Sequence, residues 1–191
     1  MAEPGLLDLF VRPLHDSGIK YLVTGGIATI VYGEPRFTRD IDIILAVRPG
    51  DSKRFLNLWP AAEFYVPPIE VFESESARPL HGHFNLVHIE TGLSADCYVA
   101  GSDPMHQWAF DDVQTFDVDG IPLRVAPVEY VIVRKLSYYA QSGSTRHLED
   151  IVRIRRIQGT AVDGSKIAMW VRSLGLEPAW AALVRLEDPG K

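Results

Sequence analysis

The chain has 191 residues, a formal net charge of −6 and a single cysteine. This length is enough to bury a substantial core, and the acidic balance argues against wholesale nonspecific binding to nucleic acid. One cysteine excludes an intramolecular disulfide, and no apolar run reaches the roughly 20 residues that a membrane-spanning helix requires. Because the N-terminus also lacks a basic or long apolar segment, we expect a cytoplasmic protein without a membrane partner.

The first elements expected are a helix, a strand and a second helix that follows a glycine turn. Apolar spacing over residues 3–17 is compatible with an amphipathic helix. The apolar run 21–23 has strand character and ends in Gly25 and Gly26, after which a segment of helical length continues to Gly33. Because glycine leaves the backbone N–H groups unobstructed at the start of a helix, this turn suits a phosphate.

The next strand carries two acidic residues on one face. Polar and apolar residues alternate over 40–45, so Asp40 and Asp42 lie on one face while Ile41 and Ile43 lie on the other. Neighbouring carboxylates repel each other, and Mg²⁺, with Mn²⁺ as the alternative, would relieve that repulsion and also bind phosphates. A glycine pair or an Asp-x-Asp sequence alone is a weak signal, but their order here predicts a metal-bound nucleoside triphosphate such as ATP.

The middle of the chain is less informative. A turn at 49–51 precedes a helix with an apolar stripe over 55–59, and 64–72 is expected to contain a short strand interrupted by two prolines. The charged, turn-rich segment 73–82 is expected to be a mobile loop. Four histidines suggest zinc, but they lack cysteine partners and helical spacing, so solvent-facing or hydrogen-bonded side chains are the better interpretation. These histidines are His81, His83, His88 and His106.

A hairpin with one internal carboxylate follows. Residues 84–89 and 93–99 are typical of two antiparallel strands joined by a short turn that contains Glu90. Asp96 shares a strand face with Tyr98, whereas Cys97 points to the other face and is expected to be a buried structural thiol. An Asp inside such an apolar strand is costly unless it is paired or binds a metal, which makes Asp96 a candidate ligand.

The pattern changes near residue 127. Before it, a short helix over 103–112 precedes two strands around Asp119-Gly120, a strong signal of a type I′ hairpin. After it, the pattern is helical, with glycines close to the breaks. We therefore expect an α+β protein with a core over 1–126 and a helical C-terminal part over 127–191 packed on that core. The helical segments expected are 128–141, 147–158, 163–174 and 178–186.

Basic residues on these helices form a second group of interest. Lys135 lies among apolar neighbours, so it is either a snorkelling lysine or a phosphate ligand. The cluster of Arg153, Arg155 and Arg156 is either a solvated, ion-paired face or, as the minority interpretation, a contact for RNA or a phosphorylated partner. The sequence alone leaves these alternatives open.

The order of the motifs resembles the nucleotidyltransferase superfamily of the polymerase-beta type. That family has a Gly-Gly or Gly-Ser turn, a helix and then Ser/Thr-x-Asp-x-Asp, which match Gly25-Gly26 and Thr38-Arg39-Asp40-Ile41-Asp42. With Gly33, Arg36 and Thr38, the sequence looks most like the abortive-infection and toxin-type branch, with some similarity to lincosamide-modifying enzymes. The resemblance implies a short mixed β-sheet flanked by helices and a helical C-terminal part that closes over the nucleotide.

The toxin-type branch also has polar residues in its helical part. Its pattern is a Lys on a helix after the sheet, an Arg-rich turn and a basic-Asp pair at the start of the next helix. Lys135, Arg146 and Asp150 match this pattern in order. Glu149 departs from it, because the pattern commonly has a basic residue at that place.

The reaction that the resemblance implies is metal-dependent transfer of a nucleoside monophosphate from an NTP to a hydroxyl or phosphate of an acceptor. Asp40 and Asp42 would hold the metal, and a third carboxylate would complete a second metal site and help to deprotonate the acceptor. Asp96 is the best match for that third carboxylate, and Glu90 is the runner-up. The residues expected to contact the nucleotide are Gly25, Gly26, Arg36, Thr38, Lys135, Arg146 and Asp150.

The acceptor expected from the toxin-type resemblance is a macromolecule, either tRNA or a protein, and an antitoxin would be the regulatory partner. Two alternatives stay open. One is an antibiotic-modifying nucleotidyltransferase that acts on an aminoglycoside or a lincosamide. The other is a noncatalytic module of a toxin–antitoxin system that binds a nucleotide or a partner.

Overall fold

The computed structural model describes residues 5–35 and 37–187, and their backbone contacts form two units. The first unit contains residues 5–27 and 37–126, and the second contains residues 28–35 and 127–187. Helix α2 (Gly25–Tyr32) therefore begins in the first unit and ends in the second. The expected packing of the C-terminal part on the core stays a prediction.

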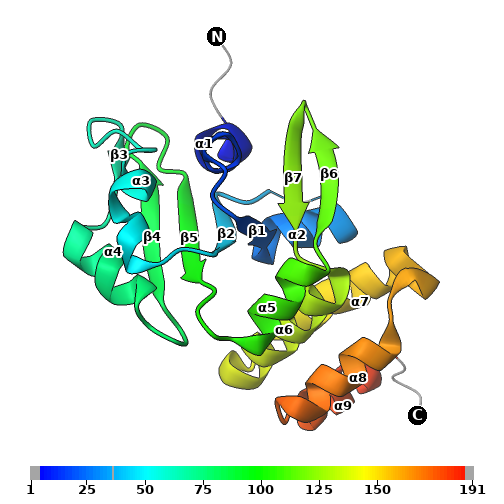
Figure 1. Cartoon of the computed structure of the whole chain (residues 1–191). Helices are drawn as coiled ribbons and strands as arrows, with labels where there is room; N and C mark the ends of the chain where they lie inside the picture. Colours follow the sequence, from blue (N-terminus) through cyan, green and yellow to red (C-terminus); the bar gives the residue numbers. More distant parts are fainter. Residues whose placement is uncertain (1–4, 36, 188–191) are drawn as a thin grey trace. The chain divides into compact units, whose positions relative to one another are not determined.

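Among the described residues, seven strands of the first unit form one mixed sheet (Figure 1). Their order is β3-β4-β5-β2-β1-β7-β6. The neighbours β2 and β5 are parallel, as are β1 and β7, whereas all other neighbours are antiparallel. The expected mixed sheet flanked by helices is thus confirmed. The strands are β1 (Tyr21–Thr24), β2 (Asp40–Leu45), β3 (Phe64–Tyr65), β4 (His83–His88), β5 (Ser94–Val99), β6 (Gln114–Val118) and β7 (Ile121–Val125).

The register of β2 and β5 brings acidic residues of two strands together. Asp42 lies opposite Asp96, and Asp40 lies two residues earlier on the same face of β2. Ile41, between Asp40 and Asp42, and Cys97, directly after Asp96, are fully buried on the other face. One face of this strand pair therefore forms core, and the other carries three carboxylates.

Aromatic side chains pack where the sheet meets α3 (Ser52–Leu56) and α4 (Ile69–Ser76). The ring of Phe55 lies 5.0 Å from that of Phe72 and 5.4 Å from that of Phe84, measured between centroids. All three side chains are buried, and α4 contacts β4 directly. The other helical segments of this unit are a π-helical turn (Leu7–Val11), α1 (Arg12–Ser17), a 3₁₀ turn (Pro49–Asp51) and α5 (Pro104–Asp111).

The expectation of a mobile loop over 73–82 is wrong for its first part, because α4 continues to Ser76. Pro68 immediately precedes this helix, a place where the missing N–H of proline costs little. Phe72 and Ser76, four residues apart, are buried on one side of the helix, whereas most of the charged residues stay exposed. The charges that suggested a loop are therefore the solvent side of an amphipathic helix.

The second unit is organised around α6 (Val128–Ser142). This helix contacts α7 (Arg146–Gln158), α8 (Gly164–Ser173) and α9 (Glu177–Glu187), and a 3₁₀ turn (Gly159–Ala161) follows α7. Glu129 is buried and accepts the backbone N–H of Asp163 at 2.7 Å, so it fixes the start of α8. Within the described ranges, every helix is too short or too polar to span a bilayer.

The aromatic packing predicts a large stability difference between two adjacent residues of α4. Phe72→Ala should lower the free energy of unfolding of the first unit by about 3–5 kcal/mol, because it leaves a cavity among buried rings. Val71→Ala is the matched control, since Val71 is 42% exposed and should change that energy by about 0.5 kcal/mol or less. Urea unfolding followed by circular dichroism measures both, and equal losses would contradict the packing described.

Candidate functional site

The carboxylate of Asp42 packs against the glycine turn between β1 and α2. Gly25 has a φ of +57°, and a Cβ added there would overlap the carboxylate and lie 2.8 Å from Asp42 Cβ. The Gly26 N–H donates a hydrogen bond to Asp42 Oδ2 at 3.2 Å. Glycine at position 25 is therefore required twice, by its backbone conformation and by the side chain that lies against it.

The hydrogen bond from the Gly26 N–H to Asp42 uses one of the backbone groups expected to bind phosphate. The amide of Gly26 points at a carboxylate oxygen, so the start of α2 already stabilises an anion. A phosphate bound to the same N–H would have to share it with Asp42 or displace it. The assignment of Gly25 and Gly26 to the nucleotide stays a prediction.

Thr38 holds the second carboxylate. Its hydroxyl donates to the Asp40 side chain and also lies 3.3 Å from the Asp40 backbone oxygen. Arg39 reaches across to the β4–β5 turn and donates to the carbonyl of Thr91 at 2.9 Å. The short segment before β2 is thus anchored at both residues, and Asp40 is exposed at its end. Arg36, also expected to contact the nucleotide, lies outside the described residues.

Asp96 is the third carboxylate on this face. Burial raises the pKa of Asp96, the nearby His83 lowers it, and the negative charge of Asp40 raises it. The effect of Asp40 means that the two carboxylates interact electrostatically. Glu90, the runner-up, is exposed in the turn that joins β4 to β5. Strand register therefore brings Asp96, and not Glu90, beside Asp42.

Two aromatic side chains without an expected catalytic role also lie on this face. Tyr98 Oη donates to Asp42 Oδ1 at 3.4 Å. His83 is opposite Tyr98 in the pairing of β4 with β5, and their ring centroids are 4.8 Å apart with an interplanar angle of 36°. His83 Nε2 lies 3.9 Å from Asp96 Oδ1. The alternation of Asp96 and Tyr98 in the sequence pointed to one shared face, but adding His83 to it required the hairpin register.

The carboxylates on this face suit a divalent cation in their chemistry. They offer the oxygen ligands that Mg²⁺ and Mn²⁺ prefer, and their mutual repulsion favours a bound cation. Within residues 5–35 and 37–187, however, no three His, Cys, Asp or Glu side chains form a group that could hold a metal ion as they stand. The three carboxylates are the right kind of ligand, and the strand register places them on one face. Their side chains would have to rotate to bring the oxygens together around a cation.

Two further histidines and the cysteine have ordinary structural surroundings. His88 is buried with Nδ1 2.9 Å from Thr91 Oγ1, and His106 is buried with Nδ1 3.4 Å from the Ala100 carbonyl. Cys97 is fully buried, and burial raises the pKa of its thiol. A protonated, inaccessible thiol agrees with the expected structural role.

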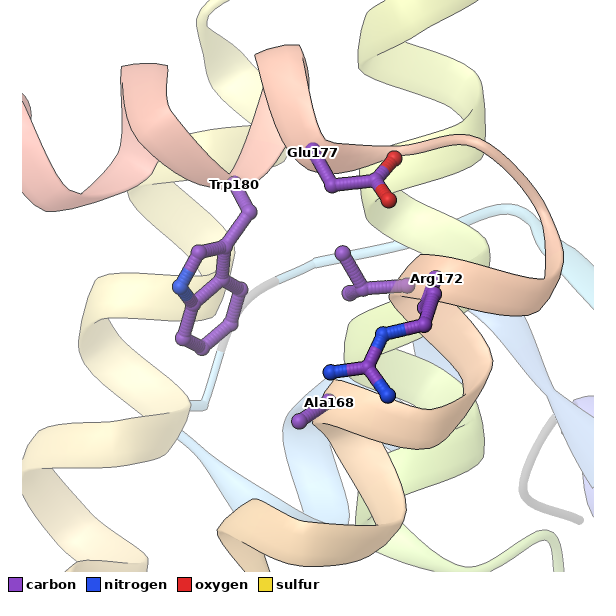
Figure 2. Close-up of a pocket in the computed structure, with 5 residues that line it drawn as sticks. Ala168, Arg172, Glu177 and Trp180 are labelled. Carbon is purple, nitrogen blue, oxygen red and sulfur yellow. The ribbon is translucent and has the colours of Figure 1, made fainter.

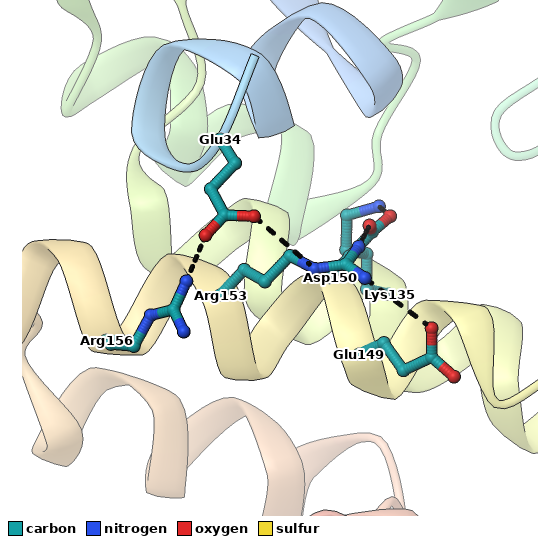
Figure 3. A network of polar contacts seen from close by, with 6 residues as sticks. All are labelled: Glu34, Lys135, Glu149, Asp150, Arg153 and Arg156. Atoms are coloured by element: carbon teal, nitrogen blue, oxygen red, sulfur yellow. Dashed lines mark hydrogen bonds and ion pairs between the residues drawn. The ribbon is translucent and has the colours of Figure 1, made fainter. Parts of the chain in front are cut away.

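The second unit contains a buried ion pair between two of the residues expected to contact the nucleotide. Lys135 Nζ on α6 lies 2.6 Å from Asp150 Oδ2 on α7, and the two side chains are only 8% and 4% exposed. Arg153 Nη1 lies 3.5 Å from the other carboxylate oxygen of Asp150 (Figure 3). Burial of the ammonium argues against a snorkelling lysine. A phosphate contact by Lys135, and by the exposed Arg146, stays a prediction.

Arg153 and Arg156 of α7 are engaged by carboxylates (Figure 3). Arg153 Nε lies 3.7 Å from Glu34 Oε2, and its Nη2 lies 3.8 Å from Glu149 Oε2. Arg156 pairs with the other oxygen of Glu34. Glu149, which departs from the toxin-type pattern, thus helps to neutralise an arginine on its own helix. The structure supports the ion-paired interpretation of this cluster.

A small pocket lies between α8 and α9 (Figure 2). Its volume of about 210 Å³ is below the roughly 300 Å³ at which pockets for drug-sized ligands begin, so it is not a candidate for the nucleotide. The ring of Trp180 also lies 5.2 Å from Arg155 Cζ, and Arg155 pairs with Glu187. The pocket is lined by Ala168, Val171, Arg172, Glu177 and Trp180.

Known proteins resemble this chain in fold and not in sequence. No protein-family model and no curated protein sequence matches it. An antigenic nucleotidyltransferase-like protein from Paracoccidioides brasiliensis matches with a TM-score of 0.60 and 22% identity, covering 95% of this chain and 86% of that one. The chain has a nucleotidyltransferase-like fold.

Two further structures share this nucleotidyltransferase-like fold. ANT(2″)-Ia, solved in complex with adenylyl-2″-tobramycin, matches with a TM-score of 0.58 and 14% identity, covering 92% of this chain and 97% of that one. The lincosamide antibiotic adenylyltransferase LnuA, bound to lincomycin, has a TM-score of 0.52 and 14% identity, covering 77% and 92%. At these identities the match establishes the fold alone, and the toxin-type branch stays a prediction.

The contact between Gly25 and Asp42 predicts that alanine is tolerated poorly at position 25. Gly25→Ala should destabilise the first unit by about 1–2 kcal/mol through backbone strain, and by about 1–3 kcal/mol more through overlap with Asp42. Gly120→Ala is the matched control, because Gly120 has a φ of +76° and open space around it. It should lose only the strain component in urea unfolding, and equal losses for the two variants would contradict the contact.

The buried ion pair of Lys135 and Asp150 predicts that a second substitution restores stability lost by the first. Lys135→Met should destabilise the second unit by about 3–5 kcal/mol because it leaves the Asp150 charge buried and short of a partner. Adding Asp150→Leu should recover much of this loss, since two apolar groups can replace a buried pair.

Arg156→Met serves as the control for that rescue. Arg156 and Glu34 are 67% and 44% exposed, so the loss should be about 1 kcal/mol or less. Helical circular dichroism during urea unfolding reports all three variants. If the double variant is less stable than Lys135→Met alone, the pair is not the source of the penalty.

Proposed function

We propose that this chain is a nucleotidyltransferase that moves a nucleoside monophosphate from an NTP to an acceptor. The observation that carries the proposal is the placement of Asp40, Asp42 and Asp96 on one face of a nucleotidyltransferase-like sheet, with Asp42 against the glycine turn. Carboxylates gathered beside a helix N-terminus can bind a divalent cation and a phosphate together.

Asp40 and Asp42 hold the divalent cation in this proposal, and Asp96 is the third carboxylate. Mg²⁺, or Mn²⁺ in its place, would offset the charge of the triphosphate and stabilise the entering and leaving oxygens of an in-line displacement. Tyr98 and the Gly26 amide leave lone pairs of the Asp42 oxygens available, because an ionised carboxylate has about four acceptor positions. The first unit therefore supplies the ligands from strands that fix their spacing.

The transfer itself is a substitution at the α-phosphorus of the NTP. An acceptor oxygen forms a bond to that phosphorus, the bond to the oxygen bridging the β-phosphate breaks, and pyrophosphate leaves with its electron pair. Where the acceptor is a hydroxyl, the Asp96 carboxylate accepts its proton.

The contacts expected around the glycine turn and before β2 are part of the same proposal. Gly25, Gly26, Arg36 and Thr38 belong to the glycine turn and the segment before β2, where they would fix the phosphates. The contacts with the nucleotide expected of Lys135, Arg146 and Asp150 in the second unit stay predictions; within that unit, Asp150 accepts a hydrogen bond from the Lys135 ammonium.

For the acceptor, the toxin-type resemblance favours tRNA or a protein, with an antitoxin as the regulatory partner. A specific observation supports a second candidate, a small antibiotic. The arginines expected to attract RNA are paired with Glu34, Glu149 and Glu187, so the basic cluster offers little free positive charge. Moreover, two proteins that share the fold are an adenylyltransferase for lincosamides and a protein solved with an adenylylated aminoglycoside.

The proposal predicts labelled product from an α-labelled NTP and Mg²⁺ or Mn²⁺, and its loss in Asp42→Asn. Removing this carboxylate should reduce transfer by on the order of 100- to 1000-fold, the range for a group that stabilises transition-state charge. Asp111→Asn is the matched control, because Asp111 is exposed at the end of α5. Purified protein is incubated with a cell lysate and each NTP, and RNA and protein are then separated on gels.

Parallel reactions with an aminoglycoside and a lincosamide identify the acceptor class. Label on RNA or protein supports the macromolecular acceptor, and label on a drug alone supports antibiotic modification. If the wild type yields no labelled product in any reaction, nucleotidyl transfer is contradicted, and the noncatalytic module remains as the function.

A further inference from the structure

We propose that His83 and Tyr98 form a ring pair that positions the Asp42 carboxylate for its divalent cation. This inference rests on the proposed function, because it needs Asp42 to be a metal ligand. The two residues come from β4 and β5, and neither belongs to the motif that the sequence resembles. Their role would be to orient a ligand, without contact with the reacting atoms.

The Asp42 carboxylate is held at both of its oxygens. Oδ2 accepts the Gly26 N–H at 3.2 Å, and Oδ1 accepts the hydroxyl of Tyr98 at 3.4 Å. Two donors on opposite oxygens fix the plane of the group, whereas one donor would let it rotate about its terminal torsion, which has a broad energy profile. Tyr98 therefore adds a second contact that helps to orient the carboxylate already tethered by Gly26.

Orientation matters here because the neighbouring carboxylate belongs to a different strand. Asp42 and Asp96 are register partners in β2 and β5, so their backbone positions are fixed by the parallel ladder. Only side-chain torsions remain to aim their oxygens at a shared cation. Groups that hydrogen-bond a metal ligand without binding the metal themselves commonly fix the orientation of that ligand. Their loss typically weakens metal affinity by about 10- to 100-fold.

His83 acts on Asp42 through the tyrosine. It is the register partner of Tyr98 across the β4–β5 hairpin, and the two rings pack at a centroid distance of 4.8 Å. This packing restricts the swing of the phenol ring and so keeps its hydroxyl near Asp42. The imidazole Nε2 also faces Asp96 Oδ1 at 3.9 Å, which is beyond hydrogen-bond distance. Ring packing is thus the stronger of the two contacts.

The test measures Mn²⁺ binding to the full chain by the paramagnetic resonance signal of the free ion, with no nucleotide present. Tyr98→Phe keeps the ring and removes the hydroxyl, so it should weaken Mn²⁺ binding by about 10-fold. His83→Ala should cause a similar loss, and His83→Phe, which keeps a ring against Tyr98, should bind within about twofold of the wild type. Tyr65→Phe and His15→Gln change exposed residues of the same unit and serve as matched controls.

A double variant shows whether His83 acts through Tyr98 or whether the two residues affect Mn²⁺ binding independently. If His83 works through Tyr98, His83→Ala combined with Tyr98→Phe should bind Mn²⁺ no more weakly than Tyr98→Phe alone. Losses that multiply would overturn the proposed route, as would a His83→Phe variant that binds as poorly as His83→Ala. Thermal unfolding of each variant, unchanged relative to the controls, shows that the fold is intact.

Asp42→Asn distinguishes a failure of the ring-pair proposal from a failure of the proposed function. If Asp42→Asn loses Mn²⁺ binding and Tyr98→Phe does not, the ring pair has no positioning role and the proposed function stands. If Asp42→Asn binds Mn²⁺ like the wild type, the metal assignment of the proposed function fails and the ring-pair proposal fails with it. Loss in both, with rescue by His83→Phe, supports the proposal.

Discussion

The candidate site depends on one contact, the packing of the Asp42 carboxylate on the backbone of Gly25 and Gly26. It ties β2 to the turn between β1 and α2, and it leaves no room for a side chain at position 25. A carboxylate in that place gains from the peptide dipoles at the start of α2, which offset part of its charge. The strand that supplies Asp42 also supplies Asp40, and its parallel partner supplies Asp96, so the acidic face follows from the strands around this contact.

The second unit solves a different electrostatic problem. Lys135 and Asp150 are buried together, where each charge would be costly alone, and Arg153 engages the second oxygen of Asp150. Glu34 and Glu149 then approach Arg153 from the solvent side. Buried pairs add little net stability but penalise every arrangement that separates them, which restricts how α6 and α7 can pack. Such a restriction is useful where a lysine must keep one orientation.

Local patterns in the sequence were enough to predict the elements that carry the site. Alternation in β2 placed Asp40 and Asp42 on one face because strand periodicity is a local property. The parallel partner of β2 was not predictable in this way, since it comes from a later hairpin and no short pattern records parallel pairing. The same holds for Glu34, which pairs with arginines of a helix far along the chain. The prediction of a loop was wrong for the first part of 73–82 for another reason: the charged residues on the solvent side of an amphipathic helix resemble the composition of a loop.

The position of Cys97 gives this protein an internal reporter. The residue lies in β5 directly opposite Ile43 of β2, is fully buried, and is the single thiol of the chain. A thiol reagent can reach it only when the two strands part or the surrounding core opens, because local opening governs access to buried groups. The rate of labelling at this one atom therefore records how often the strand pair that carries the three carboxylates, or the core packed against it, opens, and a ligand that bridges the strands would slow the part that comes from strand separation.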